Sequence, residues 1–239
     1  MIILFFFIGH WYLSLFMQTM FLHRYASHQM FTLTKFWERV FFFFTFIIQG
    51  SSFLNPRAYA ILHRLHHAHS DTDKDPHSPR FSRNLVRMNK NTVESYENIL
   101  NNRVSYENLE YNIPRWEALE NFSEKWVVRL GFVFIYAFIY YTYSTSAWQF
   151  LLVPIHAVMG PLHGSIVNWC GHRYGYKNFS KVKDDSKNTL PFDFITMGEL
   201  FQNNHHNDPN NVKFSRKWFE IDPGYVIIYM LNKLGITKL

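Results

Sequence analysis

Long apolar runs separated by strongly polar segments are the feature of this 239-residue chain that most restricts its fold. Residues 2–22 read IILFFFIGHWYLSLFMQTMFL, close to the ~20 apolar residues that a helix needs to cross a bilayer. Residues 126–143 and 147–169 are two further runs of this kind, and only Ser144-Thr145-Ser146 separates them, so they must form an antiparallel helical hairpin. We therefore predict an all-α polytopic membrane protein that is a single domain over residues 1–239.

Another apolar run, residues 40–54, is shorter and is broken by Gly50-Ser51-Ser52. We predict that it lies in the membrane interface and does not cross. A crossing here would place the polar segments 23–28 and 63–67 on opposite faces of the membrane, whereas an interfacial segment leaves them on one face. Basic residues are frequent on that face, which predicts that it is cytoplasmic.

Two polar segments share one histidine spacing. His63, His66 and His67 stand at positions i, i+3 and i+4. In the second segment Gln202, His205 and His206 have the same spacing. Residues three and four apart lie on the same helix face, so each set can converge on one point.

Other histidines have related spacings. Asn168 and His172 are four apart and can also share a helix face, whereas His23 and His28 are five apart and need a helix end or a bend to meet. Nine of the thirteen histidines lie in polar stretches that adjoin the apolar runs.

Such clustering of imidazoles is unfavourable without a metal once any of them is protonated. Imidazole is the commonest metal-binding side chain and suits Fe, Zn and Cu, whereas the single cysteine excludes CxxC metal chemistry. Because eight or nine ligands exceed the need of one ion, we predict a cytoplasmic histidine-rich cap that holds a dimetal site.

These motifs resemble those of the membrane fatty acid desaturases, specifically the acyl-CoA Δ9 branch and its bacterial relatives. HRYASH is similar to the first histidine box of that family, HRLHH to the second and GELFQNNHH to the third, and the stretches NWCGHRYGYKNF and HSDTDKDPHSP also resemble family signatures. The resemblance runs from about Phe16 to the C-terminus. It implies a diiron centre that uses O2 and two electrons to remove two hydrogens from a fatty acyl chain.

The resemblance also implies roles for individual residues. Asn168 would hold an iron through a bound water, and Gln202 departs from the family pattern, which has histidine there. A glutamine oxygen can bind a metal or a metal-bound water, but it is a weaker donor than imidazole. The iron ligands implied by the resemblance are His23, His28, His63, His66, His67, His172, His205 and His206.

Residues near the boxes have less direct interpretations. His163 is a reserve partner in case Gln202 does not bind metal, and His69 and His77 stay outside the predicted ligand set. The basic residues Arg80, Arg83, Arg87 and Lys90 fit a solvated basic face better than an acyl-headgroup site. The carboxylates Asp71, Asp73 and Asp75 are better suited to orienting imidazoles than to binding iron.

The predicted partners follow from the same resemblance. They are O2, membrane lipid and a fatty acyl substrate carried on CoA, on a carrier protein or in a lipid. The chain has no fused cytochrome domain and no cysteine cluster, so electrons must come from a separate protein. The net charge of +6 is modest, and we predict no nucleic-acid partner.

Three other functions share some of these features. A fatty acyl or lipid hydroxylase on the same scaffold would use the same ligands and differ only in its product. A metal transporter would place histidines and acids along a path through the membrane, whereas only His10, His156 and His163 lie within the apolar runs. A soluble ferritin-like diiron enzyme would need Glu-x-x-His pairs on long amphipathic helices, which are missing.

Overall fold

The computed structural model describes all residues from 1 to 239, and the chain is mostly helical, as the sequence predicts. Helices α1 to α5 span Ile2–Met17, Lys35–Gln49, Pro56–His69, Leu85–Leu100 and Glu117–Ser123, and α6 to α10 span Trp126–Tyr143, Val153–Ala157, Met159–Arg173, Gln202–Asn207 and Pro223–Lys233. Shorter helical segments are the π-helix η1 (Gln18–Ser27) and the 3-10 segments η2 (Gly50–Ser52), η3 (Glu107–Leu109) and η4 (Ala147–Leu152). Two short strands, β1 (Thr32–Leu33) and β2 (Thr237–Lys238), pair antiparallel.

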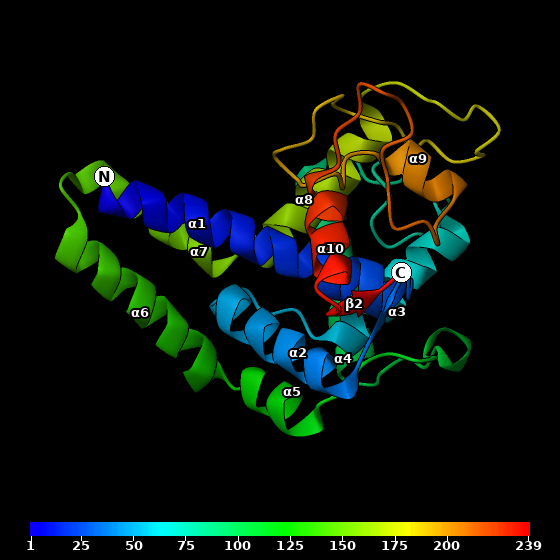
Figure 1. Ribbon diagram of the computed structural model, residues 1–239. Coiled ribbons are helices and arrows are strands. Elements are labelled where there is room, and N and C mark those ends of the chain that lie inside the picture. Colours follow the sequence, from blue (N-terminus) through cyan, green and yellow to red (C-terminus); the bar gives the residue numbers. More distant parts are fainter.

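The helices divide the molecule into two ends. The start of α1 lies beside the turn after α6 at one end, and α3, α9 and long loops gather at the other end, here called the cap (Figure 1). Ile2–Ser27 and Trp126–Tyr143 are both long and apolar enough to cross a membrane. The fold class predicted from the sequence, a helical membrane protein with a histidine-rich cap, is confirmed.

The third predicted span differs from a straight helix over 147–169. It consists of η4 and α7 followed by α8, and the axis bends by 77° near Val158. Pro161 cannot donate a helical hydrogen bond, and the Gly160 N–H donates to Ser52 Oγ at 3.1 Å. Helix α8 thereby turns toward the cap and carries Asn168 and His172 with it.

Helix α2 does not cross the molecule. Its inner face buries Phe42 and Phe46, and it ends at Gly50, which has a φ of 53° and packs so closely against Tyr136 of α6 that a side chain there would collide with the phenol. The chain then turns back through η2 into α3. Both histidine segments therefore stay at the cap end, as the sequence predicts.

Ending a helix inside the protein leaves backbone carbonyls that need donors. The His10 ring donates from Nε2 to Ile48 O at 2.5 Å. Arg129 on α6 donates to Ser51 O at 3.1 Å and to Phe53 O at 3.3 Å. Residues of two predicted spans thus stabilise the turn that brings the chain back to the cap.

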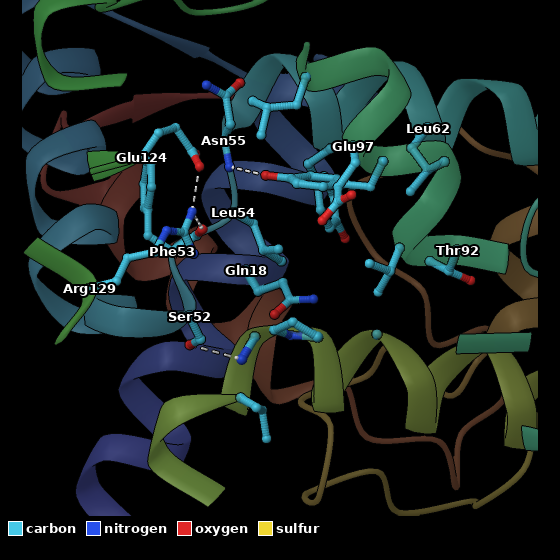
Figure 2. A pocket seen from close by; sticks show the side chains of 18 of the residues that line it. Gln18, Ser52, Phe53, Leu54, Asn55, Leu62, Thr92, Glu97, Glu124 and Arg129 are labelled. Atoms are coloured by element: carbon cyan, nitrogen blue, oxygen red, sulfur yellow. Dashed lines mark hydrogen bonds and ion pairs between the residues drawn. The ribbon is translucent and has the colours of Figure 1, made fainter. Parts of the chain in front are cut away.

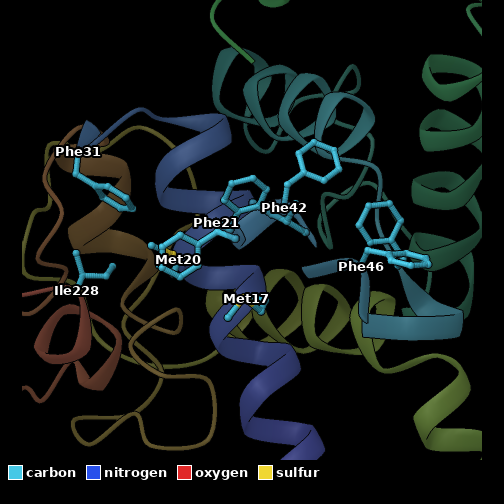
Figure 3. Packing of buried hydrophobic residues seen from close by; sticks show 10 residues of the cluster. Met17, Met20, Phe21, Phe31, Phe42, Phe46 and Ile228 are labelled. Carbon is cyan, nitrogen blue, oxygen red and sulfur yellow. The ribbon is translucent and has the colours of Figure 1, made fainter. Parts of the chain in front are cut away.

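The main hydrophobic cluster lies on the outer side of η1. Side chains of α1, η1, α2 and α10 meet there, and Figure 3 shows Met20 and Phe21 of η1 between Phe42 of α2 and Ile228 of α10. Close packing of this kind fixes the orientation of η1. The opposite side of η1 faces the histidines of the cap.

The close approach of Gly160 to η2 gives a testable prediction. A Cβ at this position would lie 2.8 Å from the backbone oxygen of Ser52, so Gly160→Ala should lower stability by about 1–3 kcal/mol, the usual effect of overpacking. The measurement is the melting temperature of the purified protein in detergent micelles.

Gly131→Ala is the matched control, because a Cβ at Gly131 of α6 has no atom within 4 Å. It should leave the melting temperature unchanged or raise it, since alanine favours the helix. Equal melting temperatures for the Gly160 variant and the parent protein would contradict the proposed cause of the bend.

Candidate metal centre

A π-helix brings the first two histidines together. In η1 the His28 N–H donates to His23 O at 3.2 Å, so the backbone bond joins residues five apart instead of four. Residues five apart then lie on one face, and the His23 and His28 rings have their centroids 5.1 Å apart. The sequence indicates that this pair needs an irregular helix, and the π-helix meets that need.

The first histidine cluster combines residues of η1, α3 and α9. The Nε2 atoms of His28 and His63 are 2.7 Å apart, and His205 Nε2 lies 3.0 Å from His67 Nε2. Each of the five residues offers one ring nitrogen, and these nitrogens all lie within 4.8 Å of one another. The members are His23, His28, His63, His67 and His205.

The second cluster joins His66 of α3, His172 of α8 and His206 of α9, again with ring nitrogens within 4.8 Å. Each ring donates from Nδ1 to a carboxylate, and each Nε2 atom is buried without a hydrogen-bond partner. The acceptors are Asp75 for His66 at 2.9 Å, Asp71 for His172 at 2.7 Å and Asp184 for His206 at 2.6 Å. Metal-binding histidines adopt this arrangement: a carboxylate orients each ring through Nδ1, and the free Nε2 atoms converge on one point.

The electrostatics of the centre favour metal binding. Burial, together with the other imidazoles, lowers the pKa of His28, His63 and His67 well below the usual range, so these rings are neutral at neutral pH. Burial acts to raise the pKa of Asp71, but the hydrogen bond from His172 outweighs it and holds this pKa at about 2. Neutral imidazoles beside ionised carboxylates are the protonation states in which metals bind.

A further carboxylate supports the first cluster. Glu199 lies with Oε2 2.5 Å from His23 Nδ1, and it also accepts a hydrogen bond from the Thr19 hydroxyl. Asp71 and Asp75 contact the imidazoles as predicted, whereas Asp73 is exposed.

Two carboxylates of the centre were missed by the sequence interpretation. Glu199 lies in the GELF stretch that begins the third histidine box, so its place beside the histidines was a sequence signal for a role in the centre. Asp184 lies in a segment without a histidine motif, and nothing in the sequence marks it.

Asn168 and Gln202 lie beside the clusters. Asn168 Nδ2 donates to Gly164 O at 2.9 Å, and Gln202 Nε2 donates to Glu199 O at 2.6 Å. Both border a chamber of about 30 Å³ that His23 and His63 also line.

The two histidines outside the predicted ligand set, His69 and His77, differ in their surroundings. His69 is half-buried at the end of α3. His77 is buried with its ring centroid 4.6 Å from that of His66, and neither of its ring nitrogens has a partner. His66, Asp75 and His77 form a third group that could hold a metal, so the structure adds His77 to the residues near the centre.

A cavity of about 1230 Å³ adjoins the centre. It reaches from His63 between α4 and α8 to Arg129 on α6, and Figure 2 shows Leu54, Leu62 and Gln18 projecting into it. At the far end Arg129 pairs with Glu124 at 2.7 Å. The cavity thus connects the histidines with the first turn of a predicted membrane-spanning helix.

The fatty acid desaturase family matches residues 1–225 of the chain. This protein belongs to the fatty acid desaturase family. It is therefore an oxidoreductase, and its membrane helices and histidine clusters fit the family.

Several known proteins are similar to this chain. Delta-9 desaturase-like 5 protein of Arabidopsis thaliana is 27% identical over 90% of this chain and 69% of its own length. Hex-5-enoyl-[acyl-carrier protein] acetylenase of Moorena producens is 28% identical over 96% of this chain and 74% of its own length. Acyl-CoA C20 Delta5-desaturase of Anemone leveillei is 26% identical over 92% of this chain and 67% of its own length.

The carboxylates that orient the second cluster give a testable prediction. Asp184→Asn should weaken metal binding about 10- to 100-fold, because the amide no longer fixes the His206 ring as a carboxylate does. The measurement is bound metal per chain after dialysis against a graded series of chelator concentrations.

The neighbouring Asp185 provides the control. Its carboxylate is 45% exposed and reaches only the exposed Arg80, at 3.5 Å, so Asp185→Asn should retain metal like the parent protein. Equal metal loss in both variants, or in neither, would show that Asp184 does not support a metal ligand.

Proposed function

We propose that this protein is an O2-dependent fatty acyl desaturase with a histidine-ligated diiron centre. One iron would be held by the cluster of His23, His28, His63, His67 and His205. The other would be held by His66, His172 and His206, and Asn168 would hold an iron through a bound water. The observation that carries the proposal is the set of three buried Nε2 atoms without partners, each on a ring whose Nδ1 donates to a carboxylate.

The chemistry requires a metal-oxygen oxidant, because no protein side chain removes hydrogen from an unactivated methylene. When bound, the two irons would supply this oxidant from O2 and two electrons. The protein's own residues hold and orient the ligands and limit the access of water to the buried centre.

The cavity between α4 and α8 is suited to the acyl chain. Leu54, Leu62 and Met88 line it, and it passes His63 of the first cluster. We assign an acyl-CoA substrate and Δ9-like regiochemistry. The name of a similar acyl-CoA C20 Delta5-desaturase supports the CoA carrier, and that of a similar Delta-9 acyl-lipid desaturase 1 supports the position of the double bond.

Orientation and electron supply complete the proposal. Basic residues are frequent at the cap, so the cap would face the cytoplasm. Electrons would reach the centre from a separate donor protein that docks on this face.

Fatty acid analysis tests the function directly. Cells that express the parent chain should gain an unsaturated fatty acid, and cells that express His66→Ala should not, because the second iron site loses one of its three imidazoles. The measurement is gas chromatography with mass spectrometry of total fatty acids, which also locates the double bond.

His69→Ala is the matched control, since His69 lies in the same helix but in neither cluster, and it should retain the activity. A hydroxylated product would favour the hydroxylase alternative. An unchanged fatty acid profile with well-expressed, iron-loaded parent protein would contradict the proposed function.

A further inference from the structure

A small polar chamber lies beside the first histidine cluster, between η1, α3, α8 and α9. Its volume is about 30 Å³, which is enough to hold an ordered water. Gln18, His163, Asn168 and Gln202 contribute polar side chains to its wall, and His23 and His63 connect it to the cluster.

His163 is the least satisfied group of this wall. Its side chain is 1% exposed, and neither ring nitrogen has a hydrogen-bond partner. The edge of the ring meets Trp11 with centroids 4.4 Å apart, a contact that fixes the imidazole but satisfies no polar atom. The Gln18 Oε1 atom is also buried without a partner. Buried polar atoms that converge on a space of this size are typical of a bound water.

Gln202 contributes an acceptor to the same space. Its Nε2 is committed to Glu199 O, so the amide oxygen is left to accept hydrogen bonds. The stem of Gln202 packs against α8 at Gly171, where a side chain would collide with it. Helix α8 therefore approaches closely enough for His163 and Gln202 to border one chamber.

The wall of the chamber includes three groups that can accept a hydrogen bond: the amide oxygens of Gln18 and Gln202 and one nitrogen of a neutral His163 ring. A water bound to a metal donates both of its protons and accepts none, so it matches this set. The spacing of Gln202, His205 and His206 repeats that of His63, His66 and His67, yet an imidazole is missing at 202. His163 brings an imidazole from another helix to the chamber that Gln202 borders.

We propose that His163 and Gln202 together hold one water in this chamber, and that this water replaces the imidazole missing at position 202 as a ligand of the adjacent metal. The inference rests on the proposed function, because it requires a metal in the neighbouring cluster. It assigns to His163 a positioning role that acts through the water.

Iron affinity tests the inference. His163→Leu should release iron to a chelator about ten times faster than the parent protein, because the water loses an acceptor. Gln202→His in the His163→Leu background should restore retention, because an imidazole then takes the place of the water. The Mössbauer spectrum of one iron should change in His163→Leu, and the rescue should not return it to the parent spectrum.

His156→Leu is the matched control, since it removes a buried histidine of the same bent segment that pairs with His10 and Tyr140 away from the chamber. It should keep the parent iron-release rate and Mössbauer spectrum even if it lowers thermal stability. Parent-like iron release and spectrum in His163→Leu would overturn the inference, as would a double variant that releases iron as fast as His163→Leu alone.

The failure of the two proposals can be told apart. A parent protein that takes up no iron would refute the diiron function itself. A parent protein that holds iron and forms a double bond, with His163→Leu identical to it, would refute only the role of the chamber.

Discussion

The packing of eight imidazoles into one buried region is the constraint on which the rest of this structure depends. Neighbouring rings bring nitrogen atoms as close as 2.7 Å, which is unfavourable when both rings are protonated. Four of the eight rings are oriented by carboxylates from the outside of the clusters, and these carboxylates are Asp71, Asp75, Asp184 and Glu199. The converging nitrogens are thereby left free on the inside, where a metal would bind.

The helical elements are arranged to deliver these rings to one place. The π-helix η1 turns His23 and His28 to the same side, and α3 presents three histidines from two adjacent faces. Helix α2 stops at Gly50 and returns the chain to the cap, so the first two histidine segments remain at one end of the molecule. The bend at Val158 tilts α8 over the cap and aligns His172 with Asp71.

Hydrogen bonds from the predicted spans to the turn between α2 and α3 help to hold this arrangement. Arg129 and His10 belong to the predicted spans, yet they satisfy the carbonyls of the returning turn. Arg24 is fully buried behind the first cluster, where it pairs with Asp222 at 3.0 Å and stacks on Phe214. These contacts join the predicted spans to the returning turn, and η1 to the segment before α10.

Much of this could be predicted from the sequence. The apolar run 2–22 identifies most of the span Ile2–Ser27, the run 126–143 identifies α6, and histidine spacing identifies the residues that meet, because these signals are local. Pro161 is a local signal for a break in the run 147–169, but the contact between Gly160 and Ser52, which are 108 residues apart, could not be predicted.

For other parts of the site, the sequence carries only a weak signal or none. Asp184 comes from an irregular segment, and only the folded chain places it beside His206. The approach of His163 to Gln202 depends on how closely α8 and α9 pack at Gly171. The sequence identified His163 only as a reserve partner, and the structure shows the chamber that both residues border.

Anomalous X-ray diffraction at the iron absorption edge tests the central claim most directly, because it locates iron without reference to activity. Crystals of iron-loaded protein should give two anomalous peaks. One should lie among His23, His28, His63, His67 and His205, and the other among His66, His172 and His206. A single peak, or iron bound away from these two clusters, would contradict the account.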